Sequence, residues 1–367
     1  MRSVFFYISG HGFGHASRQI EVVNALGAIA PDVPIHIRTL APEWLFTRTL
    51  RVPVTFSTVE CDTGAVQKDS LHLDERATIE RAARFHASLA ERASAEAAIL
   101  TRAGAAVVVS DAPPLACAAA ARADAPSVVV ANFTWDWIYQ AYPEQLADAP
   151  ELLPAIRRAY TCAAAGWRLP MHGGFETFGT VDDMPFVARH SRRDPGDVRR
   201  AFDLRPDRPL VLASFGGLGA DDIDVRGIDC AGEFQILMTI RDGANGDGPP
   251  GIHLLPEATL YDRGYRYEDL VHAADVVVTK PGYGIIAECI ANGAAILYTS
   301  RGRFAEYDVL VAEMPRFLRC GFIDHEALFG GAWRDPLRAL LSAPPPPETA
   351  ATNGAEAVAR RLLEFLR

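Results

Sequence analysis

Two histidines in a glycine-rich segment are the clearest candidates for acid–base chemistry. His11 and His15 lie in residues 9–15, with the sequence SGHGFGH, directly after the short apolar run of residues 4–8 that predicts a buried strand. Ligands of α/β proteins bind beyond the carboxyl ends of such strands. Because an imidazole titrates near neutral pH, either side chain could take a proton from a hydroxyl group as its oxygen attacks. A buried structural histidine is the alternative.

A second glycine-rich segment, residues 275–288 with the sequence DVVVTKPGYGIIAE, has the order of parts expected at a diphosphate site. The β-branched residues 276–278 predict a parallel strand that is covered on both faces. The Pro-Gly pair at 281–282 ends this strand, and residues 285–291 predict a helix. A helix N-terminus offers free N–H groups and a partial positive charge, which suit pyrophosphate.

Three positions of this segment could contact a nucleotide. Lys280 would add a full positive charge at the turn, and Gly284 would remove bulk where the backbone must approach a ligand. Glu288 lies one helical turn beyond Gly284, so its carboxylate could accept hydrogen bonds from ribose hydroxyls. Glycine turns follow strands in many α/β proteins, and an ordinary turn without a ligand is the alternative.

The order strand, Lys, Pro-Gly-x-Gly and Glu is similar to the donor-binding segment of GT-B glycosyltransferases, the superfamily of UDP-glycosyltransferases and peptidoglycan GlcNAc transferases. In the plant UDP-glycosyltransferase branch, the matching stretch starts with His where this chain has Lys280. The resemblance implies that Gly282 lies beside a phosphate and that Glu288 binds the ribose. Gly284 and Ile285 stand where that branch usually has Asn and Ser, so the phosphate contacts must be rearranged.

The same resemblance implies roles in the first half of the chain. Gly14 and His15 match the Gly-His pair of these enzymes, in which the histidine after the first strand is the general base; His15 is the predicted base and His11 the second choice. Asp111 follows a predicted strand at residues 105–110 and could cap the next helix or orient the catalytic imidazole. An aspartate near this point of the chain orients the base in plant UDP-glycosyltransferases.

Two loops of the second half would complete the donor site. The first follows a predicted strand at residues 210–213, and in GT-B enzymes it faces the donor phosphates, which backbone N–H groups can bind. The second, residues 300–307, would face the donor sugar, where plant members use an Asp-Gln pair. The implied contacts are Ser214, Gly216, Gly217 and Glu306.

An aromatic cluster at residues 132–139, NFTWDWIY, is expected to form a loop after a predicted strand at residues 127–131. Trp135, Trp137 and Tyr139 could stack on a sugar or lipid acceptor, and Asp136 could bind hydroxyl groups. An aromatic plug between domains is the alternative. Together with the first glycine-rich segment, this cluster resembles the glycosyltransferase-like N-terminal region of plant arabinokinases. The kinase half of those proteins has no counterpart here, so the resemblance implies no kinase activity.

Composition narrows the class of protein. The 367 residues are 49% hydrophobic and 22% charged, which is typical of a soluble globular protein and long enough for two domains. A net charge of -10 argues against nucleic acid as a partner and leaves small molecules or proteins. The six cysteines form no C-x-x-C pair, which favours a reducing cytoplasm. No apolar stretch reaches a membrane span, although residues 44–48 could contact a membrane surface.

The first glycine-rich segment does not complete a dinucleotide fingerprint. Gly10 and Gly12 fit G-x-G-x-x-G, but His15 occupies the third glycine position. Residues 34–40, the predicted second strand, offer a histidine and an arginine where an acidic ribose-binding residue would stand. The pattern therefore argues against a nicotinamide-dependent oxidoreductase.

Each half of the chain starts with a strand, a glycine loop and a helix, which predicts an α/β protein with two Rossmann-like domains facing across a cleft, the GT-B arrangement. We expect an N-terminal acceptor-side domain at residues 1–188 and a C-terminal nucleotide-sugar domain at 209–345. The arginine-rich residues 189–208 predict a solvated linker with a short helix. The helix within residues 346–367 should pack back on the N-terminal domain.

The expected reaction is sugar transfer from a nucleoside diphosphate sugar, with UDP favoured, to the hydroxyl of a small-molecule or lipid acceptor. The helix N-terminus and Lys280 would stabilise the leaving diphosphate in place of a metal ion, and no cofactor is expected. Residues 221–224 could hold a metal, but a solvated acidic loop is the simpler interpretation. Retaining members often carry a second glutamate where this chain has Lys280, which favours inversion. A sugar-nucleotide epimerase and a non-catalytic sugar-nucleotide sensor are the alternatives.

Overall fold

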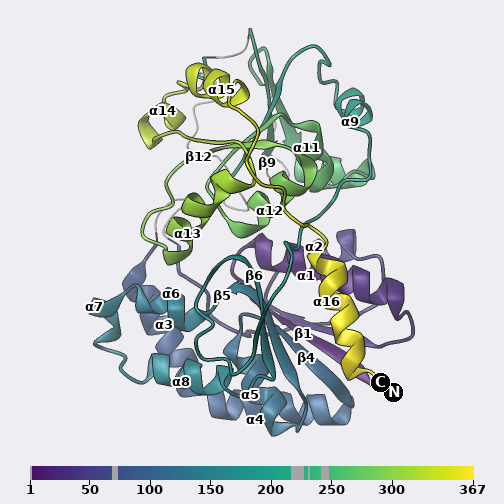
Figure 1. Cartoon of the computed structure of the whole chain (residues 1–367), viewed down its shortest axis with the longest axis vertical. Coiled ribbons are helices and arrows are strands. Elements are labelled where there is room, and N and C mark those ends of the chain that lie inside the picture. The colour runs from purple at the N-terminus through teal and green to yellow at the C-terminus, as the bar shows by residue number, and fades with distance from the viewer. Residues whose placement is uncertain (1, 68–72, 216–226, 230–231, 241–247) are drawn as a thin grey trace.

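The computed structural model describes residues 2–67, 73–215, 227–229, 232–240 and 248–367, which form two α/β domains, one above the other in Figure 1. The lower domain is built on a parallel sheet with the strand order β3-β2-β1-β4-β5-β6-β7. Its strands are β1 (Ser3–Ile8), β2 (Ile35–Thr39), β3 (Thr55–Thr58), β4 (Ala105–Asp111), β5 (Ser127–Phe133), β6 (Ala165–Gly173) and β7 (Val181–Asp183). Its helices are α1 (Phe13–Ile29), α2 (Glu43–Thr49), α3 (Glu75–Ala87), α4 (Leu89–Arg102), α5 (Pro114–Arg122), α6 (Trp135–Gln140), α7 (Pro143–Leu146) and α8 (Leu152–Tyr160).

The upper domain holds a second parallel sheet with the order β10-β9-β8-β11-β12-β13. The strands are β8 (Leu210–Ser214), β9 (Gln235–Ile240), β10 (Ile252–Pro256), β11 (Val276–Thr279), β12 (Ala295–Tyr298) and β13 (Cys320–Phe322). The helices are α9 (Pro195–Ala201), α10 (Glu257–Asp262), α11 (Tyr267–Ala273), α12 (Tyr283–Asn292), α13 (Ala305–Glu313), α14 (His325–Phe329) and α15 (Arg334–Leu341). Two parallel α/β sheets facing each other confirm the predicted fold class.

Strand register places the functional segments side by side. In the N-terminal sheet, Ile8 at the end of β1 pairs with Asp111 at the end of β4. In the C-terminal sheet, Thr279 at the end of β11 pairs with both Ser214 and Tyr298, the ends of β8 and β12. Every residue of β1, β5 and β11 is buried, as expected for parallel strands with helices on both faces. The loops after these strands therefore share one edge in each sheet.

The chain crosses between the domains twice at nearly the same place. Phe186, on the outward crossing, donates its N–H to the carbonyl of Ala351 and accepts from the N–H of Gly354 on the return. The return leads into α16 (Gly354–Leu362), which packs against α1 beside both chain ends (Figure 1). The C-terminal helix thus lies on the N-terminal domain, while the domain limits at 188, 208 and 345 remain predictions.

Two local expectations differ from the structure. Residues 132–139 do not form a loop, because α6 begins at Trp135 and turns the aromatic cluster into the domain. Helix α1 begins at Phe13, so that His15 stands on the first turn of a helix instead of in a loop. Among the described residues, no helix is both long and apolar enough to span a bilayer.

Candidate functional site

The carboxyl edges of the two sheets border a cavity of about 430 Å³ between the domains. The N-terminal wall consists of the first turn of α1 with the preceding loop and the end of β5, and the C-terminal wall of the segments around residues 279–285 and 301–306. The predicted site residues that line this cavity are His11, His15, Ser214, Lys280, Gly282, Gly284 and Glu306. Gly216 and Gly217, and the acidic residues 221–224, lie outside the described residues.

His15 is held by a buried carboxylate. Its Nδ1 lies 3.1 Å from Oδ2 of Asp111, which is fully buried at the end of β4. Helix α5 begins after Pro113 without a side-chain cap, so capping is not the role of this aspartate here. Burial alone would raise the pKa of Asp111, but the charges of Arg18 and His15 lower it below its usual value. The carboxylate therefore stays ionised and fixes the imidazole ring.

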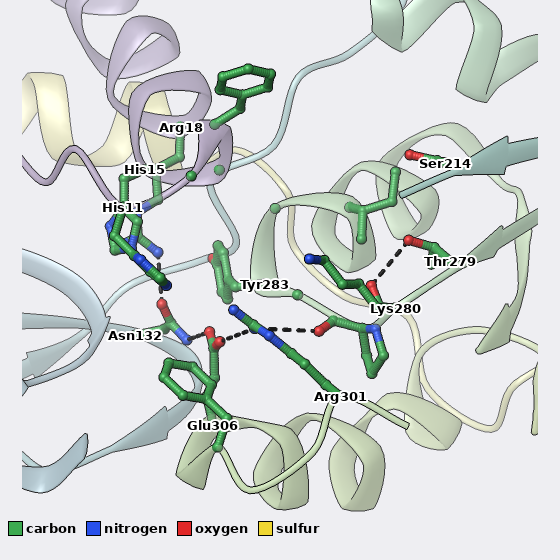
Figure 2. Close-up of a pocket in the computed structure, with 18 of the residues that line it drawn as sticks. His11, His15, Arg18, Asn132, Ser214, Thr279, Lys280, Tyr283, Arg301 and Glu306 are labelled. Atoms are coloured by element: carbon green, nitrogen blue, oxygen red, sulfur yellow. Dashed lines mark hydrogen bonds and ion pairs between the residues drawn. The ribbon is translucent and has the colours of Figure 1, made fainter. Parts of the chain in front are cut away.

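A buried network continues from this pair across the cavity (Figure 2). The guanidinium of Arg18 donates to Oδ1 of Asp111 and, through Nη1, to Oδ1 of Asn132 at 2.6 Å. Asn132 in turn donates through Nδ2 to Oε1 of Glu306 at 2.8 Å. Arg301 Nη1 lies 3.0 Å from the other oxygen of Glu306. Glu306, the expected sugar contact, thus links the two domains.

His11 is held differently, by backbone. The N–H of Ala65 donates to its Nδ1 at 3.3 Å. A Cβ atom on Gly64 would lie 2.7 Å from Cβ of His11, so the loop rests directly against the histidine. Burial lowers the pKa of His11 well below its usual value, and the neighbouring charges of Arg301, His15 and Lys280 lower it further.

The C-terminal wall is mostly backbone. Gly282 is the N-cap of α12 and no side chain caps that helix, so its first N–H groups face the cavity region with their partial positive charge. A Cβ added to Gly282 would meet nothing within 4 Å, which leaves open space beside it. Lys280 and Arg301 reach into the same space from this side (Figure 2). The arrangement suits an anion such as a diphosphate.

Gly284 has a different neighbour from the one expected. A Cβ at this position would lie 3.3 Å from Cα of Gly14 in the facing domain. The close approach made possible by this glycine is therefore to the other domain, and a ligand contact through its backbone remains a prediction. Gly14 and Gly284 together allow the two helix N-termini, of α1 and α12, to face the same cavity.

Glu288 lines a smaller pocket of about 140 Å³, which shares Ser214, Gly284 and Ile285 with the main cavity. Its Oε1 accepts from Nε of Arg189 at 2.6 Å. The same arginine lies 3.5 Å from Glu268 on α11 and is buried. The expectation of a solvated basic linker is therefore wrong at Arg189, because two carboxylates of the C-terminal domain bind it.

The same small pocket includes the segment expected as a possible membrane contact. Trp44 packs edge-on against Tyr261 of the C-terminal domain, with ring centroids 5.9 Å apart. Leu45 and Phe46 are buried in the core. The large side chains of this segment therefore make their contacts within the protein.

The aromatic cluster does not present a stacking platform as a whole. Trp135 and Tyr139 are completely buried, and Nε1 of Trp135 donates to Oδ2 of Asp62 at 2.8 Å. Asp136 is buried and pairs with Arg157 at 3.0 Å. The predictions that Trp135 and Tyr139 stack on an acceptor and that Asp136 binds hydroxyl groups are therefore wrong. Trp137 is half-buried and lines a separate pocket of about 690 Å³ with residues 302–305.

Sequence reasoning missed three residues of this network, Arg18, Asn132 and Arg301, and also Asp62, which accepts a hydrogen bond from Trp135. Arg18 is three positions after His15, which places both on one helix face, so helical spacing could have identified it. Asn132 stands at the end of β5, at the same sheet edge as Asp111. Arg301 and Asp62 carried no signal, because their approach depends on loops whose course the sequence pattern does not define.

Comparison with known proteins identifies one relative by sequence and several solved structures by fold. No family model matches the chain. An L-arabinokinase of Arabidopsis thaliana is 31% identical over 363 residues, which cover 98% of this chain. The chain spans about a third of that relative's length, 34%.

Solved glycosyltransferase structures share the fold. The glycosyltransferase SnogD from Streptomyces nogalater matches with a TM-score of 0.58 at 16% identity, covering 100% of this chain and 95% of its own. UGT2 of Phytolacca americana, complexed with UDP-2fluoro-glucose and pterostilbene, matches with a TM-score of 0.60 at 13% identity, covering 99% and 94%. The chain therefore has the GT-B fold of these glycosyltransferases.

Proposed function

We propose that this chain is an inverting, metal-independent glycosyltransferase that moves a sugar from a nucleoside diphosphate sugar, with UDP favoured, to an acceptor hydroxyl. One observation carries the proposal: a histidine held by a carboxylate in one domain and an uncapped helix N-terminus with Lys280 in the other border one cavity. A base and an anion seat on opposite walls are what a displacement at a sugar carbon requires.

His15 is the proposed base. Asp111 Oδ2 and Arg18 Nη2 both lie beside Nδ1 of the ring, at 3.1 and 3.0 Å. In the tautomer that donates Nδ1–H to Asp111, Nε2 is the nitrogen that can accept a proton. As the acceptor oxygen bonds to the anomeric carbon, its proton moves to Nε2 and the bond from that carbon to the diphosphate oxygen breaks. Asp111 then stabilises the imidazolium, and Arg18 keeps Asp111 in place.

The leaving diphosphate would lie against the N-terminus of α12. Backbone N–H groups there and the ammonium group of Lys280 would stabilise its growing charge without a metal ion. The nucleoside would occupy the adjoining pocket, where Glu288 could accept a ribose hydroxyl through the oxygen that Arg189 leaves available. Ser214 and Ile285 line both spaces, so one elongated ligand fits across them.

Inversion is proposed because one displacement suffices with the groups present. Lys280 stands where retaining relatives of this fold often carry a second glutamate, and a cation cannot supply that carboxylate. Comparing the anomeric configuration of product and donor by NMR tests this point. Retention would contradict both the single displacement and the role of His15.

The first experiment is a binding and turnover panel. Thermal shifts with UDP, dTDP, GDP and their sugars identify the donor. The acceptor panel includes sugars related to L-arabinose, because the similar Arabidopsis protein is named as an L-arabinokinase. His15→Ala should lower turnover by about 10²- to 10⁴-fold with unchanged UDP affinity. An unaffected turnover would exclude His15 as base, and sugar interconversion without acceptor would identify an epimerase.

Gly282→Ala is the matched variant on the other wall. Its Cβ would enter the open space beside the helix N-terminus, so protein stability should not change. If a diphosphate fills that space, UDP affinity should fall about tenfold, which corresponds to about 1.4 kcal/mol. Unchanged affinity would show that the diphosphate does not bind at this wall.

Turnover that persists in excess EDTA would support metal independence.

A further inference from the structure

The hydrogen bonding of His11 defines its protonation state. Because the N–H of Ala65 donates to Nδ1 at 3.3 Å, that nitrogen must present a lone pair. A neutral imidazole with an accepting Nδ1 carries its proton on Nε2. The ring cannot easily turn over, since the loop at Gly64 lies against its Cβ and the Phe304 and Trp135 rings lie about it, with centroids 6.3 and 5.9 Å away.

The charged groups around His11 favour this neutral form. Arg301 and Lys280 face it from the C-terminal domain and His15 from α1, and each would repel an imidazolium. Asp62 faces it from a polar pocket on the other side, but Ser9 and Trp135 donate hydrogen bonds to its two oxygens. Burial, together with the charges of Arg301 and Lys280 and the neighbouring ring of His15, holds the pKa of His11 well below its usual value.

Arg301 approaches the same space from the opposite wall. Within the described residues, its hydrogen bonds use Nη1, which donates to Glu306 at 3.0 Å and to the carbonyl of Pro281 at 3.5 Å. Its guanidinium carbon lies 4.4 Å from the centroid of the Phe304 ring, which places the group against that ring at the edge of the cavity. Nη2 is thereby left to donate to a ligand.

We infer that His11, as a neutral Nε2–H donor, and Arg301, through Nη2, form a clamp across the cleft for an anionic phosphate oxygen of the ligand. The identity of that anion as the donor's diphosphate rests on the proposed function; the protonation state of His11 does not. Two donors from different domains would bind the ligand only when the cleft has the width seen here. His11 is then a binding residue and His15 alone serves as base.

The tautomer can be tested without any activity. Long-range ¹H–¹⁵N NMR spectra of the histidine side chains, assigned with a His11→Gln variant, should show His11 with its proton on Nε2 and no titration between pH 5.5 and 8. A proton on Nδ1, or a titration midpoint near 6.5, would overturn the inference.

Affinity measurements test the clamp. By calorimetry, His11→Ala should weaken UDP binding about tenfold, as for loss of one hydrogen bond to a charged group. His11→Gln should stay within about twofold of wild type, because its carboxamide can keep an N–H near the position of Nε2. Arg301→Lys, which keeps the charge and loses the planar donor pair, should weaken UDP binding severalfold. Uridine, which lacks phosphate, should bind all four proteins equally.

The outcomes separate the two proposals. If wild type binds UDP and His11→Ala binds it equally well, the clamp is wrong while the proposed function stands. If wild type binds none of UDP, dTDP and GDP, the proposed function fails, and inorganic pyrophosphate becomes the probe: loss of its binding in His11→Ala but not in His15→Ala supports the clamp. Equal pyrophosphate binding in both variants contradicts it.

Discussion

The two walls of the cavity present different chemical groups: charged side chains on one and backbone N–H groups on the other. The N-terminal wall is a buried network of charged side chains, in which His15, Asp111 and Arg18 are each less than one-tenth exposed. The C-terminal wall around Gly282 and Gly284 presents helix N–H groups and open space. A base must be aimed at one atom, which rigid side-chain contacts achieve. A diphosphate presents many oxygens, for which fixed backbone dipoles suffice.

This difference determines how each wall should respond to substitution. Changes in the N-terminal wall disturb buried charges, so they should alter turnover, stability and pH dependence together. Changes in the C-terminal wall alter the space beside glycines, so they should alter ligand affinity with little effect on stability. Each variant below tests whether this division holds.

Asp111→Asn should have the largest effect. The carboxamide cannot stabilise an imidazolium at His15 as the carboxylate does, so turnover should fall about 10³-fold at unchanged UDP affinity. Arg18 would lose its buried counter-charge, and the free energy of unfolding should fall by about 3 kcal/mol. Steady-state kinetics and urea denaturation give both numbers.

The matched control is Asp136→Asn. Asp136 is also a buried carboxylate of this domain that pairs with an arginine, Arg157, but it does not line the cavity. The control should lose stability and retain turnover per folded molecule. Equal loss of turnover in both variants would mean that Asp111 acts only through the fold.

Asp62→Asn should change the pH dependence of stability. Burial raises the pKa of Asp62 from 3.8 to about 6, although His15 and hydrogen bonds from Ser9 and Trp135 oppose the rise. The unfolded chain therefore releases this proton first, so the stability that Asp62 contributes below pH 4 is lost as pH rises to about 6. The loss is at most about 3 kcal/mol, and Asp62→Asn should not show it.

Urea denaturation of wild type and Asp62→Asn at pH 4, 5, 6 and 7 measures this difference. The variant should gain stability relative to wild type as pH rises and level off above pH 6. Asp111, with its lowered pKa, contributes in the opposite direction, and its stabilisation is lost as pH falls. Parallel curves for wild type and Asp62→Asn would show that Asp62 is not held protonated by burial.

Local elements of the two walls could be predicted from the sequence, but contacts between distant segments could not. Strand ends and glycines have local signatures, so the strands before both glycine segments, a helix within residues 285–291 and the orientation of His15 as one of two roles for Asp111 could be predicted. Two contacts could not be predicted: the one between Asn132 and Glu306, and the one between Arg189 and Glu288. The first joins the two domains and the second joins the linker to the C-terminal domain, and both depend on long-range packing. The prediction of a stacking surface in the aromatic cluster failed for a related reason. The cluster is buried through contacts with Asp62 and with helix α8, which a local sequence pattern does not reveal.

Gly284→Ala should have the smallest effect and separates the walls most directly. The added methyl group would lie 3.3 Å from Cα of Gly14, so the domains must move apart by a few tenths of an ångström. Overpacking of this size costs about 1 kcal/mol. Because the cost falls on the contact between domains, UDP affinity and turnover should each fall about fivefold, with the unfolding midpoint nearly unchanged. Gly14→Ala is the reciprocal control for the contact between the domains, since a Cβ there would meet nothing within 4 Å, and it should leave that contact and the unfolding midpoint unchanged. If both variants are neutral, the cleft width does not limit binding, and the two walls act independently.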